Sequence, residues 1–468
     1  MRTIFIPIFS GMEGKNILRT DIYRVLAERS DIQLVFFLRH AALKTYYANE
    51  FAHPRSVFEV VPDVRRSAAE RFFSFLKYYL LRSATVDLRR RLHREESGNW
   101  FYYGLSFFAN RLLARPSIRR IVRFIDERLI RESVFEEFFE KYNPALIFLA
   151  DLFDDLECAF ARAARRRGVR SVGMINTWDR TTSRWMIRTL PDYFIVFNEI
   201  MKKELADYAD MESIRIAVCG TVQHDHLVAH PPTPRQIFFQ KMGIPLTHRL
   251  LVYCPLGAAF DGSRKTLDAH IIARLSSWIT GRAFGTDEIT LVVRFHPNDR
   301  VREEDLKSYP HVVYDIPGIK FAREFASSVV ARTRGQNWDM SQEDLDRLRD
   351  TLAYAAVVIC YYTSLSIDGA VLDKPVININ FDVKNDIFVE VPHPYYTTTH
   401  YQKAAVTAGI RLVHNEKELQ EWIVLYLNDP SRDREGRARL VETQCGSVDG
   451  KSGKRVGEFI LSFLEKNR

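Results

Sequence analysis

Short apolar runs alternate with amphipathic stretches along the first half of the chain. The runs IFIPIF (residues 4–9) and ALIFLA (145–150) are followed by the helical patterns TDIYRVLAERS (20–30) and LECAFARAARRRG (156–168). Continuously apolar strands separated by helices are typical of βαβ units around a parallel sheet that is buried on both faces. The pattern therefore predicts a doubly wound α/β domain over residues 1–228.

A second series of the same kind follows a proline-rich loop, HPPTP (230–234). Its apolar runs include LLVYCPLG (250–257), ITLVVRFHP (289–297) and AAVVICYYTS (355–364). Proline clusters between periodic segments mark loops and linkers. We expect a second α/β domain over residues 229–450, and a C-terminal helix over residues 451–468 that packs back on the N-terminal domain.

The first domain contains an insertion of long aromatic helices at about residues 70–140. The segment from Arg82 to Arg131 carries twelve arginines against five acidic residues. Apolar stripes at helical spacing usually pack inward. A basic, aromatic helical surface can instead rest on a membrane or hold a lipid-linked acceptor. The sequence leaves both interpretations open.

Composition fits a globular protein of two large domains. The 468 residues are 46% hydrophobic and 27% charged. No apolar run approaches the roughly 20 residues that cross a bilayer. The cysteines are scattered without metal-ligand spacing, so we expect buried thiols rather than a disulfide framework: Cys158, Cys219, Cys254, Cys360 and Cys445.

The first βα turn, SGMEGKN, has some features of a phosphate loop. A P-loop requires glycine where Phe9 stands and Ser or Thr where Asn16 stands, so an ATPase signature is excluded. Glycines at such a turn let a substrate approach the backbone closely. We expect contacts to the acceptor or donor from this turn, or else only a helix start; the residues concerned are Gly11, Glu13, Gly14, Lys15 and Asn16.

Two stretches in the second series carry groups that suit a phosphate. Thr363, Ser364 and Ser366 open a helix after a buried strand, where hydroxyls and free N–H groups can bind an anion, although plain N-capping is the alternative. Arg294 and His296 follow another strand and could neutralise a diphosphate. His296 could also donate a proton to a leaving phosphate.

A third stretch, NTWDRTTS, follows a strand of the first domain. Asp179 stands there beside Trp178 and Arg180 and is a candidate general base for an acceptor hydroxyl, or else a helix cap. Asp151, at the end of ALIFLA, is a second candidate base. The His224-Asp225-His226 cluster lacks a suitably spaced third ligand, so we expect no metal site.

The order of the C-terminal motifs resembles the C-terminal half of GT-B glycosyltransferases. The similarity is strongest to the CDP-glycerol glycerophosphotransferases of teichoic-acid synthesis and related capsule and surface-polysaccharide enzymes. It covers about residues 215–460 and rests on these motifs: CGTVQHD with Gly220 and Thr221, His296-Pro297, Thr363-Ser364, Asp368, Lys374-Pro375 and VDGKSGKRVGEFI. NTWDRTTS also resembles the S-W-D-N-x-T stretch of bacterial surface-carbohydrate proteins, with Arg180 in place of asparagine.

The resemblance implies a GT-B fold, in which two Rossmann-like doubly wound domains face a cleft. The N-terminal domain is then expected to bind the acceptor, and the C-terminal domain a nucleotide-activated donor that is UDP-, GDP-, CDP- or CMP-linked. No tightly bound cofactor and no metal are expected, because helix dipoles and side chains stabilise the leaving nucleotide. The expected donor-binding residues are Gly220, Thr221, Gly257, Arg294, His296, Thr363, Ser364, Ser366 and Asp368.

We therefore expect a glycosyltransferase that moves a sugar onto a surface glycan such as a capsule, O-antigen or lipid-linked acceptor, with Asp179 and His296 as catalytic residues. The alternatives are a CDP-polyol phosphotransferase, a nucleotide-sugar 2-epimerase and a non-catalytic glycan- or lipid-binding protein. The expected location is the cytoplasm, with peripheral attachment to the inner face of the bacterial membrane as an open alternative. No recognised module indicates nucleic-acid binding.

Overall fold

The computed structural model describes residues 1–62, 66–131, 134–256, 265–285, 288–299, 301, 306–321 and 338–466. The chain divides into two compact units, and each is considered by itself. Unit 1 comprises Met1–Val222, Thr397–His400 and Lys451–Arg468, and unit 2 comprises Gln223–Tyr396 and Tyr401–Gly450.

Unit 1 is built on a parallel sheet of seven strands in the order β3-β2-β1-β4-β5-β6-β7. The strands are β1 (Arg2–Ile8), β2 (Ile32–Leu38), β3 (Ser56–Val60), β4 (Pro144–Leu149), β5 (Arg170–Met174), β6 (Tyr193–Val196) and β7 (Ile216–Val218). The order reverses between β1 and β4. In doubly wound sheets this switch point is where ligands bind, outside the carboxyl ends of the strands.

Helices cover the sheet of unit 1, and aromatic side chains fill the core. The helices outside the insertion are α1 (Gly11–Glu13), the π-helix η1 (Gly14–Leu18), α2 (Asp21–Ala27), α3 (Ala41–Glu50), α9 (Asp155–Arg166), α10 (Arg180–Ser183), α11 (Glu199–Ala209), the 3₁₀-helix η3 (Ser213–Arg215) and α20 (Ser452–Glu465). Phe5 of β1 packs edge to face on Phe37, with ring centroids 4.7 Å apart. Helix α20 packs on α2 so closely that a Cβ at Gly457 would lie 2.8 Å from Val25.

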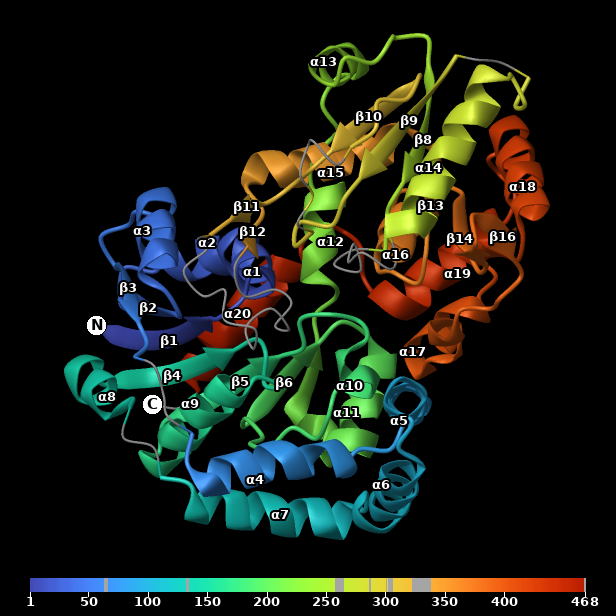
Figure 1. The fold of residues 1–468 in the computed structure, drawn as a ribbon. Coiled ribbons are helices and arrows are strands. Elements are labelled where there is room, and N and C mark those ends of the chain that lie inside the picture. The colour runs from blue at the N-terminus through green and yellow to red at the C-terminus, as the bar shows by residue number, and fades with distance from the viewer. Residues whose placement is uncertain are drawn as a thin grey trace. The chain divides into compact units, whose positions relative to one another are not determined.

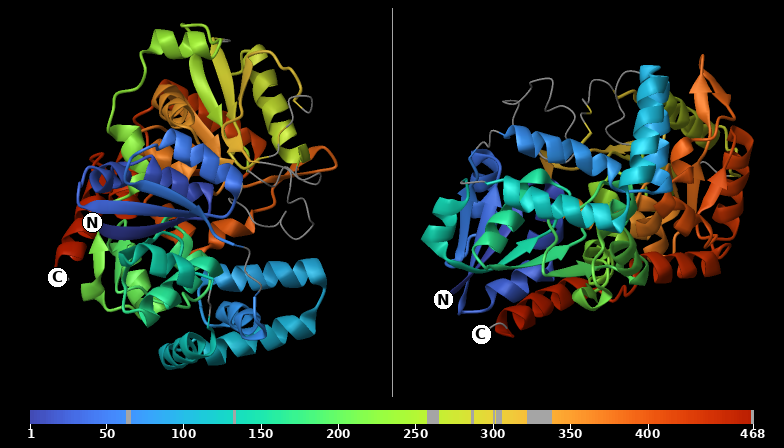
Figure 2. Two further views of the ribbon diagram at one scale, coloured as in Figure 1. Left: turned by 90° about the vertical axis from the view of Figure 1, so that its left-hand side faces the viewer. Right: turned by 90° about the horizontal axis from the view of Figure 1, so that it is seen from below.

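The predicted helical insertion is present as five α-helices and one short 3₁₀ turn. They are α4 (Ala68–Leu76), η2 (Lys77–Tyr79), α5 (Ala84–Ser97), α6 (Trp100–Leu113), α7 (Pro116–Leu129) and α8 (Glu136–Tyr142). Helices α4 and α7 lie outside α9, and α6 lies beside their ends (Figures 1 and 2). They form an outer layer on this side of unit 1.

Buried charged side chains join α4 and α7 to α9. Arg162 of α9 reaches Glu70 of α4 at 3.1 Å and Asp126 of α7 at 3.2 Å. Arg188 contacts Asp126 at 2.7 Å and also pairs with Glu70. Asp155 adds ion pairs to Lys77 at 2.5 Å and to Arg188 at 3.1 Å. We call these six side chains the buried ion network.

The apolar stripes of α6 and α7 face outward. Helix α7 buries Arg119, Arg123 and Asp126. Its exposed residues include Ile121, Phe124, Ile125 and Leu129. Helix α6 buries Ser106 and Asn110 and exposes Phe101, Leu105, Phe108 and Leu112. The interpretation that these aromatic residues pack inward is therefore wrong for α6. No helix among the described residues is long and apolar enough to cross a membrane.

Unit 2 repeats the strand order of unit 1 in a six-stranded parallel sheet, β10-β9-β8-β13-β14-β17. These strands are β8 (Arg249–Tyr253), β9 (Ile289–Arg294), β10 (Val312–Asp315), β13 (Ala355–Cys360), β14 (Val376–Ile379) and β17 (Arg411–Val413). Two antiparallel pairs lie outside the sheet, β11 (Ile319–Lys320) with β12 (Trp338–Asp339) and β15 (Asp382–Lys384) with β16 (Ile387–Val389). The predicted α/β class is confirmed in both units.

The α-helices of the second series begin with α12, which starts at the last residue of unit 1. They are α12 (Val222–Val228), α13 (Arg235–Lys241), α14 (Lys265–Thr280), α15 (Gln342–Tyr354), α16 (Leu365–Val371), α17 (Thr399–Ala405), α18 (Glu416–Asn428) and α19 (Arg434–Cys445). The switch point of unit 2 lies between β8 and β13. The segment that begins at Tyr361 therefore leaves the sheet where a ligand is expected.

Candidate functional sites

The switch point of unit 1 brings together three of the predicted residues. Asp151 follows β4, and Arg180 stands in α10 after β5. The Arg180 Nη1 donates to both carboxylate oxygens of Asp151, at 2.9 and 3.0 Å. Glu13, from the turn after β1, interacts electrostatically with both residues. The sequence predicts Glu13, Asp151 and Arg180 as separate site residues. The fold brings their side chains together in one charged cluster.

Glu13 is held in its protonated form by its surroundings. Its side chain is 1% exposed, and burial together with the negative charge of Asp151 raises the pKa of Glu13 to about 8. Glu157 of α9 is also buried, and burial, its electrostatic interaction with the neighbouring Glu13 carboxyl and the negative charge of Asp151 raise its pKa well above the usual range. The cluster therefore holds carboxyl groups that remain protonated near neutral pH.

Asp179 has the opposite character. Thr177 donates to one carboxylate oxygen at 2.8 Å and Ser183 to the other at 2.6 Å. Burial opposes ionisation of Asp179, but the positive charges of His400, Arg184 and Arg180 outweigh it and hold its pKa below the usual range. A carboxylate with so low a pKa is a weak proton acceptor at neutral pH.

The remaining predicted residues of this turn and loop lie around the cluster. Asn16 donates from its side chain to the Asn176 carbonyl at 3.0 Å, which ties the first turn to the segment after β5. Gly11 and Gly14 are buried, and Lys15 is half-buried. Trp178 packs edge to face on His400 with ring centroids 4.8 Å apart.

His296 is the most exposed of the predicted residues of unit 2 that the structure describes. It follows β9, and its Nδ1 accepts from the Asn298 N–H at 3.1 Å. A neutral imidazole that accepts at Nδ1 carries its proton on Nε2. This hydrogen bond therefore leaves Nε2 as the donor atom of the neutral ring.

Thr363 and Ser364 are half-buried at the end of β13, as expected from the sequence. Tyr362, just before them, stacks on Tyr395 with ring centroids 4.6 Å apart and planes 10° apart, and His393 lies 4.6 Å from the same ring. This aromatic cluster was not predicted from the sequence. Its signal was the run HPYY (393–396), a His-Pro pair followed by two tyrosines.

Other predicted donor-binding residues have contacts inside the fold. Arg294 is 4% exposed, pairs with Asp315 and donates to the Asp344 carbonyl at 3.1 Å. Ser366 donates to Asn378 at 2.9 Å. The His224 Nε2 lies 2.9 Å from an Asp368 carboxylate oxygen. Arg294, Ser366 and Asp368 are thus each engaged by another side chain of unit 2.

The last three predicted donor residues lie elsewhere. Gly220 and Thr221 belong to unit 1, where they follow β7. Gly220 has φ of 87°, a conformation that glycine adopts without strain, and Thr221 is 1% exposed. Gly257 lies outside the described residues.

A family model supports the resemblance stated from the sequence. The model for CDP-glycerol:poly(glycerophosphate) glycerophosphotransferases matches residues 166–462, which is more than half of the chain. The chain belongs to this family. Membership in the glycerophosphotransferase family makes the protein a glycosyl- or phosphotransferase of surface polymers. A comparison with curated proteins gives no match.

Solved structures confirm the predicted GT-B fold for this glycerophosphotransferase family member. The UDP-GlcNAc 2-epimerase from Neisseria meningitidis, bound to UDP-GlcNAc, is 12% identical with a TM-score of 0.53; the match covers 99% of this chain and 100% of that one. The UDP-GlcNAc 2-epimerase from Methanocaldococcus jannaschii is also 12% identical, with a TM-score of 0.50 over 99% and 100%. A variant of the wall teichoic acid polymerase TagF is 11% identical, with a TM-score of 0.50 over 100% and 89%.

The raised pKa of Glu13 predicts a measurable pH dependence of stability. The folded state keeps a proton that the unfolded state loses above about pH 4.5, so the stability from this group declines as the pH rises toward 8. Glu13→Gln removes this ionisable group. The free energy of unfolding of the variant, relative to that of the parent, should therefore rise by at least about 1 kcal/mol from pH 5 to pH 9. Chemical denaturation across this range is the measurement. The exposed Glu28→Gln is the matched control, and an equal pH profile for parent and E13Q would contradict the assignment.

Proposed function

We propose that the protein transfers a polyol phosphate, such as glycerol phosphate, from a CDP-linked donor to a hydroxyl group of a surface polymer. The family match over residues 166–462 is the observation that supports this choice over the sugar transfer expected from the sequence. In this reaction the acceptor hydroxyl attacks the phosphorus that carries the polyol. The bond between the two donor phosphates breaks and CMP leaves.

The proposal assigns the donor to unit 2. His296 supplies an Nε2–H donor for the departing phosphate, and Thr363 and Ser364 offer hydroxyls at the switch point. The stacked Tyr362 and Tyr395 are suited to hold a nucleotide base, because tyrosine rings stack on any of the bases. No step requires a bound metal ion.

The acceptor is assigned to unit 1. Ionised Glu13 is a stronger base than Asp179, since the pKa of Glu13 is raised to about 8 whereas that of Asp179 is lowered. Because Glu13 is mostly protonated at neutral pH, it takes the acceptor proton only in its ionised fraction, which grows as the pH rises toward 8. Asp179 then keeps its negative charge beside Arg184 and His400 and orients these cations. Asp151 and Arg180 supply polar contacts for the acceptor.

A cavity of about 320 Å³ in the same unit is suited to a lipid-linked acceptor. The rings of Phe75, Tyr78 and Trp185 line it, and so do Arg89 and Arg184. Aromatic walls accommodate an apolar chain, and guanidinium groups bind its phosphate. Arg184 interacts electrostatically with Asp179 and Asp151, so this cavity adjoins the charged cluster at the switch point of unit 1.

Sugar transfer is the second candidate, because the fold is shared with enzymes whose substrate is a nucleotide sugar. The released nucleotide separates the two reactions. Polyol-phosphate transfer from CDP-glycerol releases CMP, whereas sugar transfer from UDP-GlcNAc releases UDP.

The test is to incubate the protein with CDP-glycerol or with UDP-GlcNAc, with and without a short poly(glycerol phosphate) primer or a glycan oligomer. Nucleotide products are then resolved by chromatography. We expect CMP from CDP-glycerol, and only when the primer is present. UDP released with the glycan present would establish sugar transfer instead. Epimerised UDP-GlcNAc without acceptor would establish a 2-epimerase, and no turnover with any donor would favour a binding protein.

His296→Gln should lower the turnover number about a hundredfold or more, because an imidazolium can deliver a proton to the leaving phosphate and an amide cannot. Proton delivery requires the ring in its protonated form, in which Nδ1 no longer accepts from the Asn298 N–H. Steady-state kinetics with the donor identified above measure this effect. The control is His230→Ala, at an exposed histidine of unit 2, which should retain parental turnover. Parental turnover in H296Q would show that His296 is not catalytic.

We also propose that unit 1 rests on the surface of a membrane through α6 and α7. The exposed residues of α6 recur at Phe101, Leu105, Phe108 and Leu112, a spacing that places them on one face of the helix. Phe101 is 83% exposed and Phe124 of α7 is 56% exposed. An amphipathic helix with its apolar face outward and basic residues beside it is typical of binding in the plane of a bilayer.

Vesicle flotation tests this attachment. Phe108→Ser with Phe124→Ser should reduce vesicle binding at least tenfold, because exposed rings contribute affinity by entering the acyl region. Ile214→Ser is the matched control, since Ile214 is 84% exposed but lies outside α6 and α7. Equal loss in both variants, or none in the double variant, would disprove the assigned face.

A further inference from the structure

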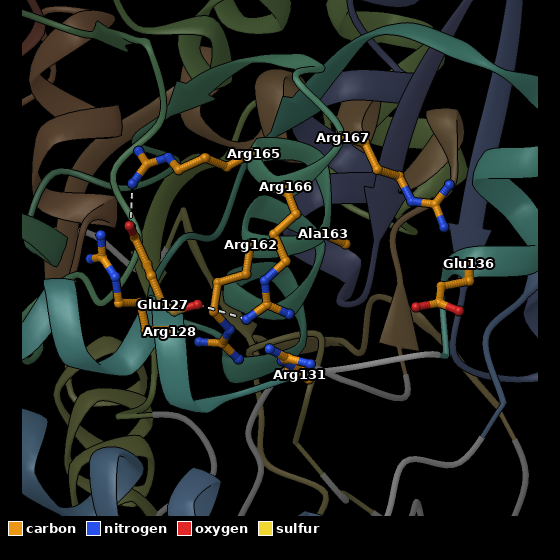
Figure 3. A pocket seen from close by; sticks show the side chains of 9 residues that line it. All are labelled: Glu127, Arg128, Arg131, Glu136, Arg162, Ala163, Arg165, Arg166 and Arg167. Atoms are coloured by element: carbon orange, nitrogen blue, oxygen red, sulfur yellow. Dashed lines mark hydrogen bonds and ion pairs between the residues drawn. The ribbon is translucent and has the colours of Figure 1, made fainter.

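A cavity of about 820 Å³ lies at the junction of α7, α8 and α9 in unit 1. Of the nine lining residues that the structure describes, six are arginines and two are glutamates, a surplus of four positive charges among them. Figure 3 shows these side chains around the cavity; the arginines are Arg128, Arg131, Arg162, Arg165, Arg166 and Arg167. None of the described side chains that line it is aromatic, so they offer no platform for a nucleotide base.

Part of this charge is used within the fold. Arg162 belongs to the buried ion network, and Arg165 pairs with Glu127. Arg167 approaches Glu140 only at 4.0 Å. These three groups support the wall of the cavity and leave the others to define its chemistry.

The other three arginines have no carboxylate within ion-pair distance among the described residues. Arg166 donates to the backbone carbonyls of Glu127, at 2.6 Å, and Ile130. Arg128 lies over the Phe124 ring, with its guanidinium carbon 3.4 Å from the ring centroid. No contact of the Arg131 side chain appears within the described ranges. Guanidinium groups stay charged at all ordinary pH values, so their mutual repulsion favours a bound anion.

Arg128 connects the cavity with the exposed face of α7. Its guanidinium stacks on Phe124, and Leu129 beside it is exposed. A ligand that binds both the arginines of the cavity and the apolar face of α7 carries an anionic phosphate next to an apolar chain. Anionic phospholipids have this chemistry, and guanidinium groups bind phosphate oxygens in a bidentate way.

We propose that the arginine cavity is a binding site for the phosphate groups of anionic phospholipids at the edge of the membrane-docking face. The inference rests on the proposed attachment through α6 and α7 and adds a preference for anionic lipid. The docking face supplies affinity for any bilayer, and the cavity supplies selectivity among headgroups. A soluble phosphate shares the ligand chemistry but lacks the chain that meets Phe124.

The experiment compares flotation on vesicles of phosphatidylcholine alone with vesicles that also contain phosphatidylglycerol. The test variant combines Arg128→Glu and Arg131→Glu, because neither arginine has an ion-pair partner among the described residues. The control is Lys241→Glu in unit 2, which also replaces an exposed cation by a carboxylate. We expect the parent and K241E to prefer phosphatidylglycerol. The double variant should lose this preference by more than about tenfold while it still binds neutral vesicles.

A second arm identifies the source of the phosphate. Thermal shift is measured with monomeric dihexanoyl phosphatidylglycerol, inorganic phosphate and tripolyphosphate. Stabilisation of the parent by the short-chain lipid, absent in the double variant, supports the site. Stabilisation by the phosphates alone would overturn the lipid assignment, and an unchanged headgroup preference in the double variant would overturn the site. Failure of vesicle binding with retained binding of the short-chain lipid would disprove the docking face but not the cavity.

Discussion

The buried ion network determines how α4 and α7 of the helical insertion are oriented. Three carboxylates, Glu70, Asp126 and Asp155, balance Arg162, Arg188 and Lys77 beneath α4 and α7. Removing one partner from such a network leaves an uncompensated buried charge, at a cost of about 3–5 kcal/mol. The polar sides of α4 and α7 must therefore face inward. Their apolar sides are left at the surface, and Arg162 is fixed in the wall of the arginine cavity.

The burial of the polar sides of these helices could not be predicted from the sequence. The 3.6-residue period located the apolar stripes of the insertion but carried no information about which side of each helix is buried. That choice depends on contacts such as Arg188 with Glu70, which are 118 residues apart. In contrast, the strands were predictable, because continuous apolar runs such as that of β1 have few alternatives once helices alternate with them.

In the candidate sites, the positions of residues along the sheet edge could be predicted from the sequence, but their side-chain partners could not. Parallel strands place the residues that follow them at one edge of the sheet, so the positions of Asp151, Arg180 and His296 were open to prediction. Their partners were not. The link of Arg294 to Asp315 and that of Asp368 to His224 are set by packing in three dimensions. The basicity of Glu13 follows from burial beside Asp151, which one sequence does not display.

Helix α20 gives unit 1 an unusual order of assembly. It packs on α2, with Gly457 against Val25, although more than 400 residues separate the two helices. Translation at about 5–20 residues per second takes roughly 20–90 s to cover that distance. Throughout this interval the surface of α2 that α20 later covers is open on the ribosome. The N-terminal half is thus a candidate client for chaperones until synthesis reaches α20.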